Sequence, residues 1–273
     1  MAAPLLAGVP DARDIVRRSI ERDPSFSRLR DYTFHERSIE RSLDSSRRVV
    51  STKSEVREVL ILFGEPYGRL IEKDGKALTP EEDRKEQEKL DKFTAKRQKE
   101  SERQRQERLA EMEKRRKRGF EFLQEILDAY DFRIAGEDQI DSNAVWAIAA
   151  TPRAGYKPRN FRSKFLAKVN GIFWIDRESY DWVKVQAEVM DTVSFGFGLA
   201  RIHKGTTIEV CQSRNAVGVW LPKSVVLRFS ARMALVKKLT GETEVTFDNY
   251  RRFQAESRVV SAQESLPSDV PGR

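Results

Sequence analysis

The chain has 273 residues, of which 39% are hydrophobic and 34% charged, and its formal net charge is +8. This length allows one large domain or two ordinary ones, and the apolar fraction allows a packed core under a strongly ionised surface. Excess positive charge directs attention to nucleic acids, anionic membrane surfaces and acidic ligands as partners. A single cysteine, Cys211, and two histidines, His35 and His203, exclude an intrachain disulfide and provide too few ligands for most metal sites. We therefore expect no metal and no other cofactor.

The two ends of the chain differ in composition from the rest. Residues 1–10 are small and apolar but lack the basic start of a secretion signal, so we expect a disordered terminus or the remnant of a removed signal peptide. Residues 254–273 are rich in Ser and Pro and are expected to be disordered. No apolar run approaches the roughly 20 residues of a membrane-spanning helix. Residues 11–253 are expected to form a single domain.

The N-terminal part predicts one helix followed by strands. Residues 11–23 place their apolar side chains on one side of a short helix, with Asp11 at its N-cap. From Tyr32 onward polar and apolar residues alternate, and residues 55–63 are rich in β-forming types. Residues 64–78 predict a turn, a short strand and a second turn.

A long helical insertion is expected over residues 79–130. Thr79 is a candidate N-cap, Pro80 fits the first helical position, and Glu82 completes a capping box with Thr79. Neither Gly nor Pro follows until Gly119, so the helix is expected to be continuous. Surface ion pairs at i,i+4 spacing support it: Glu81–Lys85, Glu88–Lys92, Glu111–Arg115 and Glu113–Lys117.

The insertion changes character along its length. Residues 83–118 contain fifteen Lys or Arg against nine Asp or Glu, and so hold most of the excess positive charge. The densest cluster is a candidate contact with an anionic membrane or a partner: Lys114, Arg115, Arg116, Lys117 and Arg118. Nucleic-acid binding is disfavoured because acidic residues are interleaved and Phe93 is the lone aromatic side chain. After Gly119 an apolar stripe follows: Phe120, Leu123, Ile126, Leu127 and Tyr130.

From Asp131 to the end of the domain, apolar residues recur at every second position. The predicted strands are 143–151, 171–179, 181–190, 197–212, 217–236 and 241–253. Long alternating strands with short connections indicate an α+β fold, in which a strongly curved antiparallel sheet is covered by helices. The apolar face of the sheet and the apolar stripe of the helix can close as a filled core or leave a cavity for an apolar ligand.

Sequence motifs for catalysis are missing from the chain. It has no nucleophile elbow, no Gly-rich phosphate loop and no His-Glu-x-x-His helix, and the glycines of residues 195–198 lie between predicted strands. Cys211 alternates with Val210 in a predicted strand and is interpreted as an inert thiol. We therefore expect that this protein is not an enzyme.

Residues 131–253 resemble a known family. The order of "VWAIAATPRAGY", "KVNGIFWIDRESYDWVKVQAEV", "FGLARIHKG", "GVWLP" and "VTFDNYRRF" resembles the LolA-type outer-membrane lipoprotein-sorting proteins, in the superfamily of periplasmic lipoprotein and lipid carriers. Residues 11–75 are similar more weakly. The resemblance implies an incomplete barrel whose concave apolar face is covered by helices, and a cavity that takes acyl chains of lipoproteins or lipids. It also implies a periplasmic monomer that makes transient contact with an anionic membrane surface or a membrane protein.

The resemblance also implies which residues would bind the acyl chain. On the sheet face these are Phe34, Val183, Val185, Ala187, Val225, Leu227, Phe229, Met233 and Phe247. On the helical lid they are Phe120, Leu123, Ile126 and Leu127. The charged helical insertion over residues 80–118 is longer than such a carrier needs. An alternative is therefore a filled β-domain that uses this helix to bind a protein partner, an anionic membrane or nucleic acid.

Overall fold

The structure is a computed structural model that describes residues 10–22, 28–160, 162–195, 200–233 and 237–252. The segments expected to be disordered, 1–10 and 254–273, lie outside the described residues apart from Pro10. The described helices are α1 (Ala12–Glu21), η1 (Leu29–Asp31), α3 (Pro80–Gln98), α4 (Glu102–Ala129) and η2 (Arg162–Lys168). The described strands are β1 (Tyr32–Leu43), β2 (Val49–Leu62), β3 (Glu65–Lys73), β4 (Lys76–Ala77), β5 (Tyr130–Ile140), β6 (Asn143–Pro152), β7 (Val169–Asp176), β8 (Trp182–Val189), β9 (Val193–Phe195), β10 (Ala200–Ile202), β11 (Thr207–Arg214), β12 (Trp220–Met233) and β13 (Lys237–Arg252).

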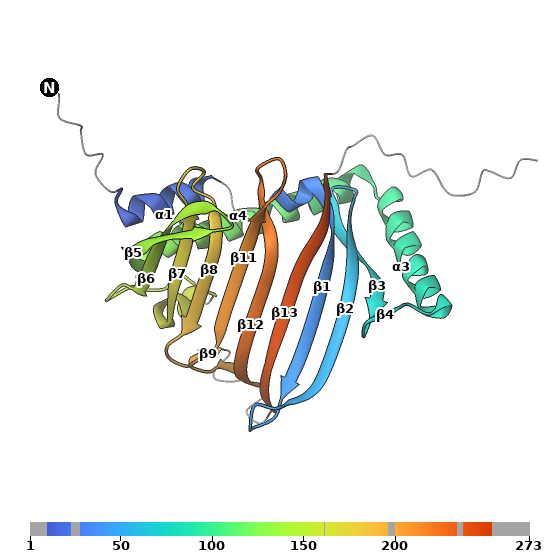
Figure 1. Ribbon diagram of the computed structural model, residues 1–273. Helices are drawn as coiled ribbons and strands as arrows, with labels where there is room; N and C mark the ends of the chain where they lie inside the picture. The colour runs from blue at the N-terminus through green and yellow to red at the C-terminus, as the bar shows by residue number, and fades with distance from the viewer. Residues whose placement is uncertain (1–9, 23–27, 161, 196–199, 234–236, 253–273) are drawn as a thin grey trace, which may run out of the picture.

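The strands form one antiparallel sheet in the order β4-β3-β2-β1-β13-β12-β11-β8-β7-β6-β5, with β10 paired to β12 and β9 to β10. The α+β class is confirmed, but the expected strongly curved, incomplete barrel is wrong: the sheet is open and not strongly curled (Figure 1). Polar residues explain this shape. Ser38 and Glu40 of β1 lie in the same cross-strand rows as Val225 and Leu227 of β12. No continuous apolar face therefore exists to draw the two ends together.

The filled core lies at the β5–β8 end of the sheet, where α1 and the end of α4 cover one face. Asp11 caps α1 as predicted, accepting hydrogen bonds from the backbone N–H groups of Arg13 and Asp14. The core is built from the buried side chains Ile15, Val16, Ile20, Ile126, Ala129, Trp146, Ile148, Phe173 and Ile175. At the opposite end of the sheet α3 packs along β3 (Figure 1).

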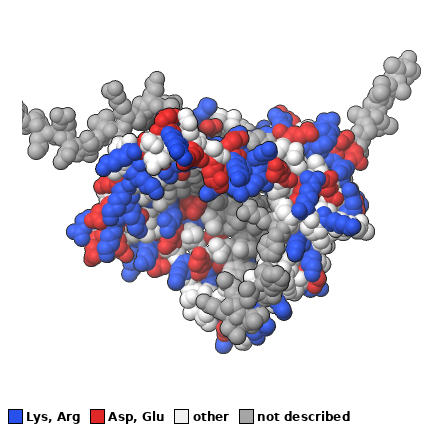
Figure 2. Space-filling model, turned by 180° about the vertical axis from the view of Figure 1, so that it is seen from behind, with Lys and Arg blue, Asp and Glu red and all other residues white. Residues whose placement is uncertain are grey.

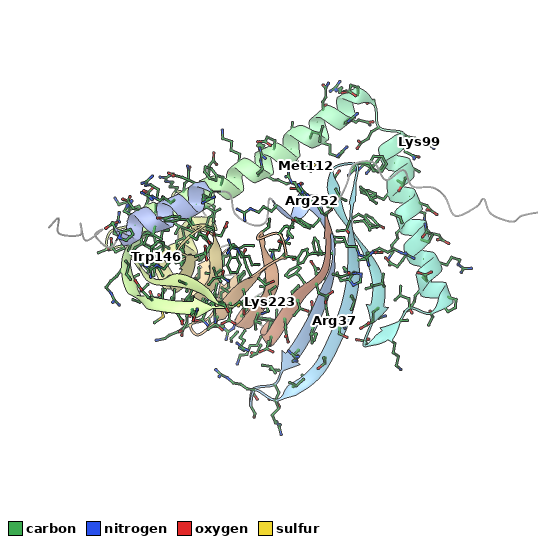
Figure 3. The ribbon with its side chains drawn as sticks, turned by 45° about the horizontal axis from the view of Figure 1, so that its top comes forward. Arg37, Lys99, Met112, Trp146, Lys223 and Arg252 are labelled. Carbon is green, nitrogen blue, oxygen red and sulfur yellow. The ribbon has the colours of Figure 1, made fainter. Side chains whose placement is uncertain are left out.

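The expected continuous helix is interrupted between α3 and α4, which meet at a corner beside Lys99 (Figure 3). The predicted capping box of Thr79 with Glu82 is confirmed. A second capping box explains the interruption, because Ser101 accepts a hydrogen bond from the Gln104 backbone and the Gln104 side chain bonds back. Such a box begins a new helix without Gly or Pro.

Two other details of the sequence prediction are corrected. The single strand predicted over 197–212 is two strands, β10 and β11, separated by a turn at Gly205, whose φ of 81° lies in the left-handed region. Of the four predicted ion pairs, Glu81–Lys85 and Glu111–Arg115 form, at 2.7 and 3.5 Å. Glu88 pairs instead with Arg84, and Glu113 with Arg116.

Gly241 is required by the pairing of the longest strands. A Cβ atom at Gly241 would lie 2.6 Å from the backbone oxygen of Arg41 and 3.1 Å from the ring of Phe229. We expect Gly241→Ala to force β1 and β13 apart and to lower the free energy of unfolding by about 1–3 kcal/mol in urea denaturation. Gly136→Ala in β5 is the matched control, because its Cβ would meet nothing within 4 Å. Equal destabilisation by both variants would contradict this role of Gly241.

Candidate functional site

The N-terminal half of α4 is fixed to the β2–β3 end of the sheet by an ionic network. Glu65 binds Arg97 at 3.1 Å and Arg108 at 2.6 Å. Glu100 binds the same two guanidinium groups at 2.6 and 3.0 Å. The four side chains are only 10–21% exposed, so water screens them little. This network holds α4 where it leaves the α3 corner.

The C-terminal end of α4 is fixed by the core and by a buried carboxylate. Ile126 and Ala129 pack against α1 and the sheet. Glu125, also buried, accepts hydrogen bonds from the Tyr156 hydroxyl at 2.6 Å and from the Arg159 backbone N–H at 2.9 Å. Both ends of α4 are therefore anchored, and its middle crosses the sheet without packing closely on the central strands.

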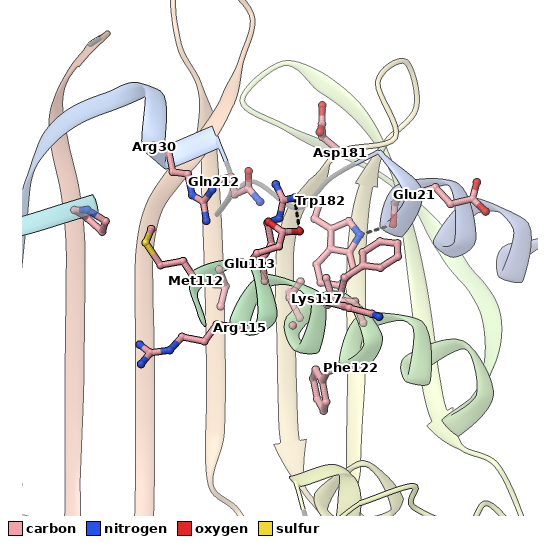
Figure 4. Close-up of a pocket in the computed structure, with 18 of the residues that line it drawn as sticks. Glu21, Arg30, Met112, Glu113, Arg115, Lys117, Phe122, Asp181, Trp182 and Gln212 are labelled. Atoms are coloured by element: carbon pink, nitrogen blue, oxygen red, sulfur yellow. Dashed lines mark hydrogen bonds and ion pairs between the residues drawn. The ribbon is translucent and has the colours of Figure 1, made fainter. Parts of the chain in front are cut away.

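A groove of about 1040 Å³ lies between the middle of α4 and the sheet. We call this space the α4 groove. Its helix-side lining includes Met112, Gly119, Phe120, Phe122 and Leu123, and its sheet-side lining includes Pro66, Trp182, Val183, Val185, Val210 and Gln212. Figure 4 shows Met112, Phe122 and Trp182 in this region, and Figure 2 shows a band of charged side chains across this face of the molecule. The lining is mostly apolar.

Trp182 reaches the groove because of an irregularity in the sheet. The register of β7 with β8 shifts between Trp174 and Ile175, so that Trp182 pairs with Ile175 while Val185 pairs with Phe173. Trp182 and Val185 therefore face the same side although three positions separate them. The indole N–H of Trp182 donates a hydrogen bond to the hydroxyl of Ser19 in α1 (Figure 4).

Charged side chains surround the opening of the α4 groove. Glu113 pairs with Arg116 at 2.8 Å on the lining of the groove. Arg30 and Lys117 also line it and form no ion pair with any described residue. The lining therefore offers two cations without an ion pair to a described residue, together with the carboxylates of Glu21 and Asp181, and such a cation can meet an anionic group of an apolar ligand.

The residues predicted from the sequence to bind an acyl chain do not all lie in one place. Val183 and Val185 of the sheet and Phe120 and Leu123 of the helix line the α4 groove. Leu123 and Val185 also pack against the filled core with α1, which contains Ile126 and contacts Leu127, and Val183 is buried in a separate cluster with Val145 and Trp220.

The remaining predicted sheet residues lie outside the lining of the α4 groove. Val225 and Leu227 share its face of the sheet, since they pair with Val210 and Ile208. Ala187 lines a second recess of about 500 Å³, and Phe229 packs over Gly241.

Two more predicted residues lie on the β1–β13 part of the sheet, and one cannot be placed. Phe34 and Phe247 contact each other, with ring centroids 6.0 Å apart. The side chain of Met233 lies outside the described residues.

The predicted basic cluster on α4 is exposed and largely paired. Arg115 and Arg118 pair with Glu111 at 3.5 and 3.0 Å, and Arg116 pairs with Glu113. Lys114 and Lys117 form no ion pair with any residue that the structure describes. Two carboxylates, Glu111 and Glu113, therefore face the five cations of this cluster, and a net positive charge remains on it.

Several lining residues were missed at the sequence level. Val210 could have been found, because it alternates with Cys211 in a predicted strand. Phe122 is outside the helical stripe and stacks on Phe165, with ring centroids 5.7 Å apart. Trp182 and Val185 could not have been placed on one face, since simple alternation puts them on opposite faces.

Catalytic and metal chemistry has little support in the described residues. They contain no group of three or more His, Cys, Asp or Glu side chains able to hold a metal ion. Burial raises the pKa of the Cys211 thiol, and the carboxylate of Glu209 raises it further, so the thiol is protonated and weakly nucleophilic at neutral pH. No helix in the described ranges combines the length and apolar character needed to cross a membrane.

Acid is expected to loosen both anchors of α4. The hydrogen bond from Arg108 holds the pKa of Glu100 below its ordinary value of 4.5. Burial by itself raises the pKa of Glu125, but the hydrogen bonds from Tyr156 and Arg159 outweigh burial and the pKa is lowered. Because both pKa values are lower when folded, their stabilisation is complete above the unfolded value and is lost as the pH falls through the folded values.

We therefore expect the thermal stability of the protein to fall as the pH is taken below about 4.5. Thermal unfolding followed by circular dichroism across this range measures the effect. A Glu125→Gln variant should lose less stability on acidification than the wild type. An identical loss in the variant would show that Glu125 does not contribute.

Leu123 and Ile126 belong to the same apolar stripe but are expected to behave differently. Ile126→Ala leaves a cavity in the filled core and should lower the free energy of unfolding by about 2–5 kcal/mol. Leu123 lines the groove and also packs, partly buried, against the filled core, so Leu123→Ala should cost less stability than Ile126→Ala and should weaken uptake of a fluorescent fatty acid. Urea denaturation and fluorescence titration of both variants check this. A larger loss of stability in Leu123→Ala together with a larger loss of uptake in Ile126→Ala would contradict this assignment of the groove.

Comparison with known proteins gives weak similarities. No protein-family model and no curated protein matches the sequence. A LolA superfamily protein from Nitrosomonas europaea is similar, with 9% identity, a TM-score of 0.33 and coverage of 90% of this chain and 95% of that chain. An outer membrane lipoprotein-sorting protein domain from Vibrio parahaemolyticus has 10% identity, a TM-score of 0.32 and coverage of 91% and 96%. A chain of the Pseudomonas aeruginosa MucA/MucB complex has 13% identity, a TM-score of 0.24 and coverage of 89% and 94%. Similarities at this level leave the family unassigned.

Proposed function

We propose that the protein is a non-enzymatic carrier that acts in the periplasm and takes up acyl chains of lipids or lipoproteins in the α4 groove. The observation that carries this proposal is the groove itself, about 1040 Å³ with a mostly apolar lining. Ligand sites in proteins typically occupy roughly 300–1,000 Å³ and combine apolar walls with a few polar groups. The core beside the groove is filled, so the groove is a local feature of the middle of α4.

Burial of methylene groups would drive binding. Each methylene removed from water contributes about 0.8 kcal/mol, which suits an acyl chain lying along Phe120, Phe122 and Val210. Arg30 and Lys117 at the opening suit an anionic head group. No covalent step is needed, so exchange of the ligand depends on movement of α4 relative to the sheet.

One observation favours a second candidate function, in which α4 binds a partner. The outer side of α4 is exposed and charged along residues 102–121, apart from Arg108 and Met112. A protein, nucleic acid or anionic membrane with complementary charge could bind there. In that case the groove would hold no ligand, and charge changes along α4 would abolish the interaction.

Lipid analysis tests the carrier proposal. The protein is purified under mild conditions, extracted with organic solvent and the extract is analysed by mass spectrometry. We expect a defined acyl lipid at about one molecule per chain, and a lower content in Leu123→Ala. A protein without lipid that also fails to take up a fluorescent fatty acid would contradict the proposal and favour partner binding by α4.

A further inference from the structure

Cations that form no ion pair with any described residue gather at the end of the sheet opposite α1 and α4. In Figure 1 this is the lower end, with the β1–β2 hairpin and the adjoining ends of β12 and β13. The sequence has no Asp or Glu over residues 192–206 or 229–241. In contrast, these two segments contain Arg201, Lys204, Arg232, Lys237 and Lys238.

Three of these cations lie side by side across neighbouring strands. Arg201 of β10 pairs with Arg232 of β12, and Arg232 pairs with Lys238 of β13. Like charges directly opposite each other in a sheet are destabilising. None of the three forms an ion pair with any described residue, and the buried Nε atom of Arg232 has no hydrogen-bond partner among them. Such a row is best stabilised by an anion from outside the chain.

Elsewhere on β12 a cation is paired with a carboxylate of the neighbouring strand. Four residues earlier, Arg228 of β12 pairs with Glu242 of β13 at 2.6 Å. Glu242 also binds Arg41 of β1 at 2.7 Å. Glu242 therefore balances Arg41 and Arg228, whereas the row of Arg201, Arg232 and Lys238 contains no carboxylate.

Exposed aliphatic side chains lie beside the unpaired cations. The β1–β2 hairpin exposes Val49 by 54% and Val50 by 63%. It follows directly on the pairing of Ser42 with Gly241, which places it next to β13. Arg47 and Lys53 flank the valines and form no ion pair with any described residue, although Lys53 lies opposite Glu40. Arg48, between them, pairs with Asp44 at 3.0 Å. Aliphatic side chains combined with unpaired cations suit the interface of an anionic bilayer.

We propose that this end of the sheet docks on the surface of a bilayer that contains anionic lipids. The docking surface consists of Arg47, Val49, Val50, Lys53, Arg201, Arg232 and Lys238. Nucleic acid fits less well, because the exposed apolar side chains are aliphatic and offer no ring for base stacking. The basic cluster of α4 is the rival surface. Its five cations share the carboxylates of Glu111 and Glu113, whereas the row of Arg201, Arg232 and Lys238 contains no carboxylate. This inference does not depend on an acyl chain in the α4 groove.

Vesicle flotation at low ionic strength tests the docking surface. Binding of the full chain is measured to vesicles of phosphatidylglycerol with phosphatidylethanolamine and to vesicles of phosphatidylcholine. The double variant R201E/K238E reverses two exposed cations of the docking surface, and R105E/K114E makes the same charge change on α4, outside the lining of the α4 groove. We expect R201E/K238E to weaken binding to anionic vesicles by about tenfold or more, and R105E/K114E by less than about twofold.

Additional readouts separate docking from folding and from ligand uptake. R201E/K238E should keep the wild-type circular dichroism spectrum and the wild-type uptake of a fluorescent fatty acid. Val50→Asp should weaken vesicle binding as well, because it places a charge where an aliphatic group would enter the interface.

Several outcomes would overturn the proposal. One is equal wild-type binding to both kinds of vesicle. Another is a loss in R105E/K114E as large as that in R201E/K238E. Tight binding of a single-stranded RNA, lost in R201E/K238E and accompanied by no vesicle binding, would assign the surface to nucleic acid instead.

Discussion

Val210→Glu should abolish uptake of a fluorescent fatty acid, with an affinity at least about 100-fold below that of the wild type. Val210 lies on the sheet side of the α4 groove, in one cross-strand row with Val185 and Val225. A carboxylate at this position would either stay charged among apolar side chains or take up a proton. Both states oppose the burial of an acyl chain. Fluorescence titration with the labelled fatty acid measures the loss.

Val217→Glu is the matched control for this experiment. It makes the same chemical change at a residue that is 74% exposed, in the turn between β11 and β12. We expect uptake by Val217→Glu to equal that of the wild type. A folded Val210→Glu protein with wild-type affinity would show that the acyl chain does not lie against β11.

Arg108→Ala should release the N-terminal half of α4. Arg108 binds both Glu65 and Glu100, and its loss leaves Arg97 to balance two poorly exposed carboxylates. Removing one charge from a poorly hydrated ionic network lowers stability by more than the intact pair contributes. The reason is that the remaining charges are left unpaired and poorly solvated. We expect amide hydrogen exchange over residues 102–115 to become at least about tenfold faster, with faster release of a bound fatty acid.

Arg103→Ala is the control for Arg108→Ala on the same helix. Arg103 is 88% exposed and pairs with Glu107 at 2.9 Å, an interaction that water screens. Its substitution should leave hydrogen exchange in α4 nearly unchanged. If Arg108→Ala also leaves exchange unchanged, the ionic network does not anchor α4.

Local signals in the sequence predicted much of the fold. Asp11 and Thr79 cap the helices expected to follow them, since a cap depends on residues within one turn. The interruption at Ser101 also has a local signal, a Ser followed three residues later by Gln104. The interruption was not predicted because the segment after Pro80 contains neither Gly nor Pro before Gly119. Alternation likewise predicted β8 and β12, because one face of each strand is apolar.

The candidate site was less predictable because it depends on contacts between distant segments. Leu123 and Ile126 lie on one helical stripe, yet Leu123 lines the groove and Ile126 packs into the core with α1. Trp182 enters the groove because the register shifts between β7 and β8, which no single strand reveals. The pairing of Arg201 with Arg232 depends on which strands are neighbours, and periodicity carries no information about that.

Photo-crosslinking of a diazirine-labelled fatty acid to the full chain tests the carrier proposal most directly. After irradiation, the labelled peptides are identified by mass spectrometry. An acyl chain in the α4 groove predicts adducts on residues 119–123 of α4 and on residues 182–185 and 210 of the sheet. It also predicts that Val210→Glu removes these adducts and that Val217→Glu retains them. Adducts confined to other surfaces, or the same adducts in Val210→Glu, would contradict the proposal that the α4 groove binds acyl chains.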